Sequence, residues 1–110
     1  MDLNKVIDIS VQDLNSQIKT KQNIILIDVR EPIETEICSL KTSLFVPLST
    51  FYENIVALEK NNSYVVLCKH GVRSSKAVEI MLDLGFKNVK NLKGGIIEWA
   101  DKIDQSMSIY

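Results

Sequence analysis

Two uninterrupted runs rich in β-branched residues dominate the hydrophobic pattern of this chain. They define candidate strands at Ile24–Asp28 and Tyr64–Cys68, and each run is shorter than a typical helix. Such runs are typical of strands whose two faces are both buried. Shorter apolar segments at 6–9, 45–46 and 89–92 predict three further strands, of which the first lies at a sheet edge.

Between these runs, apolar residues recur at helical spacing, and capping signals mark helix ends. Ser10 is the predicted N-cap of the first helix. Thr50 and Glu53 have the spacing of a capping box, which predicts a helix from there to about Lys60. The other predicted helical segments are a short turn at 34–37 after Pro32, a helix from Ser74 or Ser75 to a stop at Gly85, and a helix at 96–103.

Strands that alternate with helices predict one α/β domain, in which a small parallel sheet of about five strands has helices on both faces. The 110 residues suit a single domain over 1–110, with a core at about 5–103 and a polar tail from Asp104 that we expect to fray. In such sheets ligands bind beyond the carboxyl ends of the strands. Asp28 and Cys68 are therefore site candidates, because each closes a buried strand.

Composition narrows the function classes. The chain has 13 basic and 14 acidic residues, a net charge of -1 and a hydrophobic share of 45%, which disfavours disorder and nucleic-acid binding. The segment Met1–Ser10 lacks the apolar run of a signal peptide. No stretch approaches the roughly 20 apolar residues of a membrane span. We therefore expect a cytoplasmic protein without membrane partners.

The chain has two cysteines, Cys38 and Cys68, which lie far apart in sequence. In a reducing compartment they are expected to be free thiols rather than a structural disulfide. The absence of a C-x-x-C pair disfavours zinc and thioredoxin-like chemistry, so no metal or cofactor is predicted. Cys38 is expected to be inert.

The segment Cys68–Ser75 connects a predicted strand to the start of a helix. Backbone N–H groups at a helix start have no intrahelical partner, and the helix dipole adds positive potential there. Lys69, His70 and Arg73 add local positive charge. An electropositive loop of this kind lowers the pKa of a cysteine. We therefore predict that Cys68 is a thiolate at neutral pH.

Gly71 fits this hypothesis, because a residue without a Cβ lets the backbone approach a bound anion closely. The alternative interpretation treats Cys68 as a buried small hydrophobe, which is common for a cysteine at a strand end. The glycine, the basic residues and the following helix favour a functional cysteine.

Three segments together carry a resemblance to a known family. Leu26–Pro32 resembles the Asp-Val-Arg-Glu segment of rhodanese-like domains, Cys68–Ser74 resembles their active-site loop, and Leu92–Ile96 with Trp99 resembles their closing Gly-Gly and Trp segment. The order and spacing are those of the family over about residues 5–103. The resemblance is to single-domain rhodanese-like sulfurtransferases.

This resemblance implies that Cys68 is the catalytic residue. Its thiolate would take the outer sulfur of a small anionic donor such as thiosulfate, hold it as a persulfide, and pass it to a thiol, cyanide or a sulfur-carrier protein. No cofactor is implied. The residues implied in the active-site and substrate-binding loop are Lys69, His70, Gly71, Val72, Arg73 and Ser74. The residues expected to support the site are Asp28, Arg30, Gly94 and Gly95.

The chain departs from the family pattern after the first segment. Cys38–Leu40 stands where Gly-His-Ile is common, and Thr42–Ser43 replaces the usual Gly-Ala. This puts the local backbone in doubt rather than the cysteine loop. His70 is the only histidine, so a separate histidine base is not available.

Several of these residues have two interpretations. Arg73 either contacts the anion or pins the loop. His70 is expected to be a solvated loop residue rather than a base, and Lys69 to attract the donor. Asp28 and Arg30 are expected to form an ion pair or hydrogen bonds at the edge of the crevice. For the remaining segment, Gly94 and Gly95 are expected to form a turn and Trp99 to lie in the core.

Three rival functions remain. A Cdc25-like phosphatase or arsenate reductase shares the fold but uses a Cys-x5-Arg loop, one residue longer than the Cys-x4-Arg loop between Cys68 and Arg73. A non-catalytic interaction module is disfavoured by the retained Cys68. A protein-to-protein sulfur relay would use the same cysteine, with thiosulfate as a poor substrate.

Overall fold

One parallel sheet with the strand order β1-β5-β4-β2-β3 organises the chain. Its strands are β1 (Asp8–Ile9), β2 (Ile24–Asp28), β3 (Leu44–Phe45), β4 (Ser63–Leu67) and β5 (Asn88–Leu92). The helices are α1 (Val11–Lys19), α2 (Pro32–Thr35), the 3-10 turn η1 (Leu48–Thr50), α3 (Phe51–Ile55), α4 (Val72–Asp83) and α5 (Gly95–Lys102). The predicted α/β class and the five-stranded parallel sheet are confirmed.

The computed structural model describes residues 5–110. Residues 1–4, which belong to the predicted domain and to the segment Met1–Ser10, lie outside the described residues. None of the helices within 5–110 has both the length and the apolar content needed to cross a membrane.

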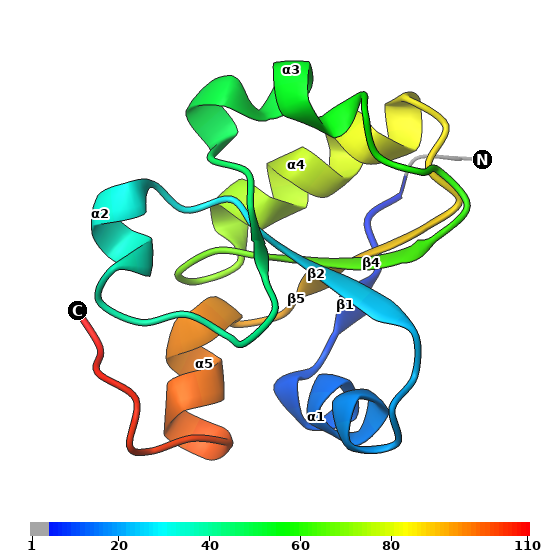
Figure 1. Cartoon of the computed structure of the whole chain (residues 1–110). Helices are drawn as coiled ribbons and strands as arrows, with labels where there is room; N and C mark the ends of the chain where they lie inside the picture. The colour runs from blue at the N-terminus through cyan, green and yellow to red at the C-terminus, as the bar shows by residue number, and fades with distance from the viewer. Residues whose placement is uncertain (1–4) are drawn as a thin grey trace.

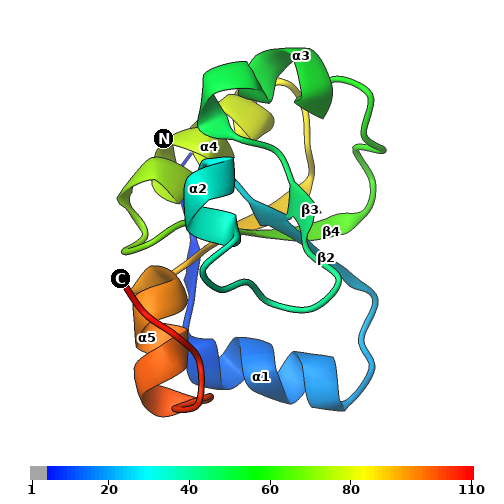
Figure 2. The same ribbon diagram turned by 60° about the vertical axis from the view of Figure 1, so that its left-hand side comes forward.

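The sheet lies between two helical layers. Helices α1 and α5 cover one face, and α3 and α4 cover the other (Figures 1 and 2). Side chains alternate along a strand, so in β4 Val65 and Leu67 pack with the α1 and α5 layer, whereas Val66 and then Cys68 belong to the α3 and α4 core. This is why β2 and β4 read as continuous apolar runs, and why Cys68 lies under α4.

The helix predicted after Thr50 begins as expected, with Thr50 at the N-cap position and Phe51 as its first residue, but its predicted capping bond and its predicted end are wrong. The Thr50 side chain makes no capping bond, and Thr50 is also the last residue of the 3-10 turn η1. The Thr50 hydroxyl instead lies 3.4 Å from the side-chain nitrogen of Asn54, and the Thr50 carbonyl accepts from that nitrogen at 2.9 Å. Helix α3 ends at Ile55, well before Lys60.

Two other helices begin earlier than predicted. Helix α2 begins at Pro32 rather than at residue 34, because Glu31 and Glu34 form a reciprocal capping box with Pro32 at the first helical position. Helix α4 begins at Val72 rather than at Ser74, after Gly71 with φ +98°. The serines looked like caps in the sequence, but Ser74 is buried inside the first turn.

The amino end of α5 fixes the backbone that follows β4. The amides of Ile96 and Ile97 donate to the carbonyls of Cys68 and Lys69 at 2.9 and 3.2 Å. Gly95, with φ +64°, makes this approach possible, because a Cβ there would overlap the Lys69 and Cys68 carbonyls. Because these carbonyls face α5, the N–H groups of the loop face the side of the loop that is turned away from α5.

Two features mark the backbone of residues 38–43, the segment that departs from the family pattern. A guanidinium nitrogen of Arg30 donates to the carbonyl of Cys38 at 2.6 Å. Thr42, which stands where the family usually has glycine, adopts φ +66°. For a β-branched residue this left-handed conformation is strained, at a cost of roughly 1–2 kcal/mol. Thr42 therefore adopts a conformation that favours glycine, and the contacts of the cysteine loop are in place.

The C-terminal segment does not fray as predicted. After α5 it turns back along the molecule, and the chain ends beside α2 (Figures 1 and 2). The Tyr110 hydroxyl accepts from Arg30 at 3.1 Å and donates to Glu34 at 2.6 Å. These polar contacts, which join residues far apart in sequence, were not visible in the local composition.

Replacing Gly95 with alanine should destabilise the fold by about 2–4 kcal/mol, because the new Cβ meets backbone atoms and the residue must keep a positive φ. Urea unfolding measures this cost. Gly85→Ala is the matched control, since Gly85 also has a positive φ but a Cβ there meets only the side chain of Lys60 at 3.9 Å. Equal losses for the two variants would contradict the proposed close packing of α5 on the loop.

Candidate active site

Cys68 follows the last residue of β4, at the carboxyl edge of the sheet. In the register of the sheet Asp28 lies beside Leu67, so the two residues predicted from strand ends meet at this edge. The Cys68 side chain is only 1% exposed and packs on one side with the apolar core below α4. The other side of its sulfur faces the loop that joins β4 to α4.

Polar hydrogen atoms from the loop and from the first turn of α4 converge on this sulfur. The Gly71 amide donates to Cys68 Sγ at 3.1 Å, and the Ser74 hydroxyl lies 3.3 Å away. Burial by itself raises the pKa of Cys68, but bonds from the Ser74 hydroxyl and from the amides of Ser74, Gly71 and His70 lower it below its usual value overall. The arrangement therefore stabilises a thiolate.

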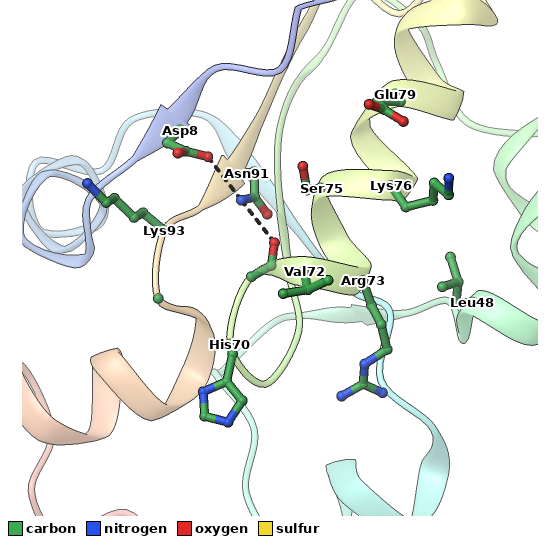
Figure 3. A pocket seen from close by; sticks show the side chains of 12 residues that line it. Asp8, Leu48, His70, Val72, Arg73, Ser75, Lys76, Glu79, Asn91 and Lys93 are labelled. Carbon is green, nitrogen blue, oxygen red and sulfur yellow. Dashed lines mark hydrogen bonds between the residues drawn. The ribbon is translucent and has the colours of Figure 1, made fainter.

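The backbone N–H groups lower this pKa as predicted, whereas the basic side chains, which were expected to add to the effect, are turned to other partners. Arg73 forms a two-pronged ion pair with Glu34, with N–O distances of 2.6 and 2.8 Å. The Lys69 ammonium lies over the Tyr110 ring, 4.3 Å from its centre. His70 projects outward from the loop (Figure 3). The contributions that lower the pKa of Cys68 most are hydrogen bonds from one hydroxyl and from the backbone.

Asn91 on β5 is a site residue that the sequence analysis missed. Its side-chain oxygen lies 2.5 Å from the Ser74 hydroxyl and shares the single hydrogen of that hydroxyl with Cys68 Sγ. Its nitrogen donates to the Gly71 carbonyl at 3.2 Å and to Asp8 at 3.0 Å, as Figure 3 shows. Asn91 thus links β1, the loop and α4. The available signal was a polar residue at a buried position of a predicted strand.

Glu34 was also missed, because it was treated only as part of a helical turn. It accepts from the Arg73 guanidinium, the Tyr110 hydroxyl and the Glu31 amide. The hydrogen bonds from Arg73 contribute most, and together these contacts lower the pKa of Glu34 from 4.5 to about 2 against the opposing effect of burial. Glu34 is therefore a carboxylate throughout the physiological range.

Asp28 and Arg30 form the expected ion pair, with an N–O distance of 2.8 Å and no exposed side-chain surface on either residue. The remaining guanidinium N–H groups reach Cys38 and Tyr110. Burial opposes the charged form of Arg30, but its hydrogen bonds to Asp28 and Tyr110 raise its pKa overall. A fully bonded buried charge of this kind holds several segments in one arrangement.

Gly94 and Gly95 form the turn that starts α5, as predicted. Gly94 has φ +81°, and a Cβ there would approach the Glu98 side chain to 2.6 Å. Trp99 packs in the core with 8% exposure. These three residues therefore support the loop from below and do not contact the sulfur.

A cavity of about 720 Å³ lies beside the loop and the first half of α4 (Figure 3). It is lined by Asp8, Leu48, His70, Gly71, Val72, Arg73, Ser75, Lys76, Glu79, Asn91, Lys93 and Gly94. Val72 is 77% exposed at its rim, whereas Cys68 is not among the lining residues. The loop therefore separates the sulfur from the main hollow.

Ser74→Ala should raise the pKa of Cys68, because it removes the hydroxyl that favours the thiolate. The pH dependence of alkylation by iodoacetamide measures this pKa. The adjacent Ser75→Ala is the control and should leave the pKa in place. An unchanged or lower pKa in Ser74→Ala would contradict the assignment of the hydroxyl as a donor to the sulfur.

Glu34 makes the free energy of unfolding depend on pH in the acidic range. Its folded pKa of about 2 lies below the unfolded value of 4.5, so its stabilising contribution is complete above about pH 4.5 and is lost as pH falls toward 2. Urea midpoints measured across this window should fall less steeply with acid in Glu34→Gln than in the wild type. The exposed Glu36 supplies the control Glu36→Gln, which should keep the wild-type slope.

Known proteins share both this sequence pattern and this fold. The family model of the rhodanese-like domain matches residues 10–102 of this chain. A solved rhodanese-related protein from Thermoplasma volcanium has a TM-score of 0.81 and 36% identity, over 88% of this chain and 93% of that protein. A sulfurtransferase of Allochromatium vinosum is 28% identical over 84% of this chain and 87% of its own length.

Larger proteins contain a similar segment. A probable adenylyltransferase/sulfurtransferase of Mycobacterium tuberculosis is 31% identical over 93% of this chain, but the chain spans only 26% of that protein. The family model covers most of the sequence, and the fold agrees with that of a rhodanese-related relative. The chain therefore belongs to the rhodanese-like domain family.

Proposed function

We propose that this protein is a sulfurtransferase that carries a sulfane sulfur as a persulfide on Cys68. The observation that supports this most directly is the set of donors around Cys68 Sγ, with the Gly71 amide at 3.1 Å and the Ser74 hydroxyl at 3.3 Å. A negatively charged terminal sulfur would occupy the same ring of donors at the start of α4. Donors fixed in this way stabilise an anion without reorganisation.

In the first step the Cys68 thiolate attacks the outer sulfur of an anionic donor such as thiosulfate. A new S–S bond forms on Cys68, the S–S bond of thiosulfate breaks, and sulfite leaves with the bonding electrons. The thiolate is already ionised, so this step requires no general base. His70, which points outward, is therefore not needed for proton transfer.

In the second step a thiol or cyanide attacks the outer sulfur of the persulfide and releases the Cys68 thiolate. The two half-reactions predict ping-pong kinetics. Cys68 is 1% exposed, so the donor and the acceptor need an opening beside the sulfur to reach it. Reduced thiols are required throughout, and a cytoplasmic location provides them.

A protein-to-protein sulfur relay is the second candidate. It is supported by the relatives in which a similar segment spans only a quarter of a longer adenylyltransferase/sulfurtransferase. In such an arrangement the persulfide on Cys68 would come from one protein thiol and pass to another. The chemistry at Cys68 is the same in both candidates, and only the identity of the donor and the acceptor differs.

The phosphatase or arsenate reductase alternative gains little support from the site. Its loop must wrap a tetrahedral oxyanion with an arginine turned toward it. Here Arg73 is engaged by Glu34, and four residues rather than five separate it from Cys68. The short loop suits one sulfur atom.

Treatment of the protein with thiosulfate should add one sulfur atom that a reductant removes, as read by intact-mass analysis. Cys68→Ser should gain none, whereas the matched control Cys38→Ser should gain sulfur like the wild type. The physical reason is that the Gly71 amide and the Ser74 hydroxyl are placed at Cys68 Sγ to stabilise the product anion.

Loading of Cys38 instead of Cys68, or of neither cysteine by thiosulfate or by a persulfide, would overturn the proposal. Hydrolysis of an aryl phosphate that depends on Cys68 would favour the phosphatase instead.

A further inference from the structure

Arg73 and Lys69, the arginine and the lysine of the cysteine loop, both contact neighbouring side chains. Arg73 is paired with Glu34 through two hydrogen bonds, and Lys69 lies on the face of the Tyr110 ring. Tyr110 also donates to Glu34 at 2.6 Å, so one cluster restrains both cations. We call Glu34, Tyr110, Lys69 and Arg73 the charge clamp.

Further hydrogen bonds hold Glu34 and Tyr110 of the charge clamp in place. The Glu34 side chain is 16% exposed and also accepts from the Glu31 amide at 3.1 Å. Tyr110 accepts from the buried Arg30, which is itself fixed by Asp28. Hydrogen bonds to Arg30 and Glu34 modify the titration of Tyr110, but burial dominates and raises its pKa, so the phenol keeps its proton. The Arg73 charge is thus compensated before any donor arrives.

The pairing of Arg73 with Glu34 affects the reactions with two classes of sulfur donor differently. Attack of the Cys68 thiolate on thiosulfate brings three negative charges together, because thiosulfate is a dianion. Attack on an ionised thiol persulfide, R–S–S⁻, brings two: the outer sulfur moves to Cys68, the S–S bond breaks, and the thiolate R–S⁻ leaves with the bonding electrons and takes a proton from solvent. Nearby uncompensated cations would assist the first reaction more than the second.

We infer that the charge clamp determines donor specificity, so that Cys68 takes sulfur from thiol persulfides in preference to thiosulfate. Glu34 and Tyr110 are then specificity-determining residues that act through Arg73 and Lys69. The inference rests on the proposed sulfurtransferase function and names its preferred donor class. It also accounts for a loop that is basic in sequence but whose Arg73 and Lys69 side chains are both engaged in the fold.

The test compares sulfur loading of Cys68 from two donors, the dianion thiosulfate and N-acetylcysteamine persulfide, which carries at most one negative charge. Single-turnover loading, followed by intact mass, gives a rate constant for each donor. The wild type should load faster from the persulfide. In Glu34→Gln the ratio of the thiosulfate constant to the persulfide constant should rise about three- to tenfold, because Arg73 is released.

Salt dependence separates an electrostatic effect from a structural one. The thiosulfate constant of Glu34→Gln should fall more steeply with added KCl than that of the wild type, since the released cation attracts the dianion through solvent. Tyr110→Ala, which frees Lys69 without changing a charge, should shift the ratio in the same direction. It also serves as a second test if Glu34→Gln does not fold.

Glu36→Gln is the matched control, because it removes the same charge from the exposed end of α2. A ratio in Glu34→Gln and Tyr110→Ala equal to that in Glu36→Gln would overturn the inference, as would faster loading of the wild type from thiosulfate. In both cases Cys68 still gains sulfur and the proposed function stands. Failure of the wild type to load from either donor would overturn the function and the inference together.

Discussion

A sulfur anion held by hydrogen-bond donors at the start of a helix is the interaction on which the rest of this site depends. Cys68 is almost fully buried, and burial alone would favour the neutral thiol. The Gly71 amide and the Ser74 hydroxyl, at distances of 3.1 and 3.3 Å, oppose that effect, and the pKa of Cys68 falls below its usual value. The thiolate is favoured here only because these few donors are correctly directed, so the elements around the loop can be understood by how they direct them.

Two elements fix this direction from opposite sides. Helix α5 takes the carbonyls of Cys68 and Lys69, and it packs so closely that a Cβ at Gly95 would overlap them. On the other side Asn91 contacts the Ser74 hydroxyl and donates to the Gly71 carbonyl. The loop is therefore held by strands and helices that are distant in sequence, which is the rigid support that a preformed anion site requires.

The charged side chains of the loop contact other side chains, whereas its backbone donates to the sulfur. Local sequence places three basic residues beside Cys68, yet Arg73 is turned to Glu34 and Lys69 to Tyr110. Charge density in the sequence is therefore a poor guide to the field at the sulfur. Stabilisation by nearby dipoles depends on short distances and suits one bound atom, whereas free cations would favour multiply charged donors.

The sequence by itself determined the α/β class, the two central strands, the position of Cys68 at the carboxyl edge of the sheet and the glycines of the loop. These features follow from short-range patterns: apolar runs, strand ends and turn residues. The tertiary structure alone decided that Asn91 and Glu34 belong to the site, that α4 begins at Val72, and that the C-terminal segment returns to the loop. The reason is physical, because hydrogen bonds and ion pairs between residues dozens of positions apart leave no periodic trace in a chain and form only when packing brings their partners together.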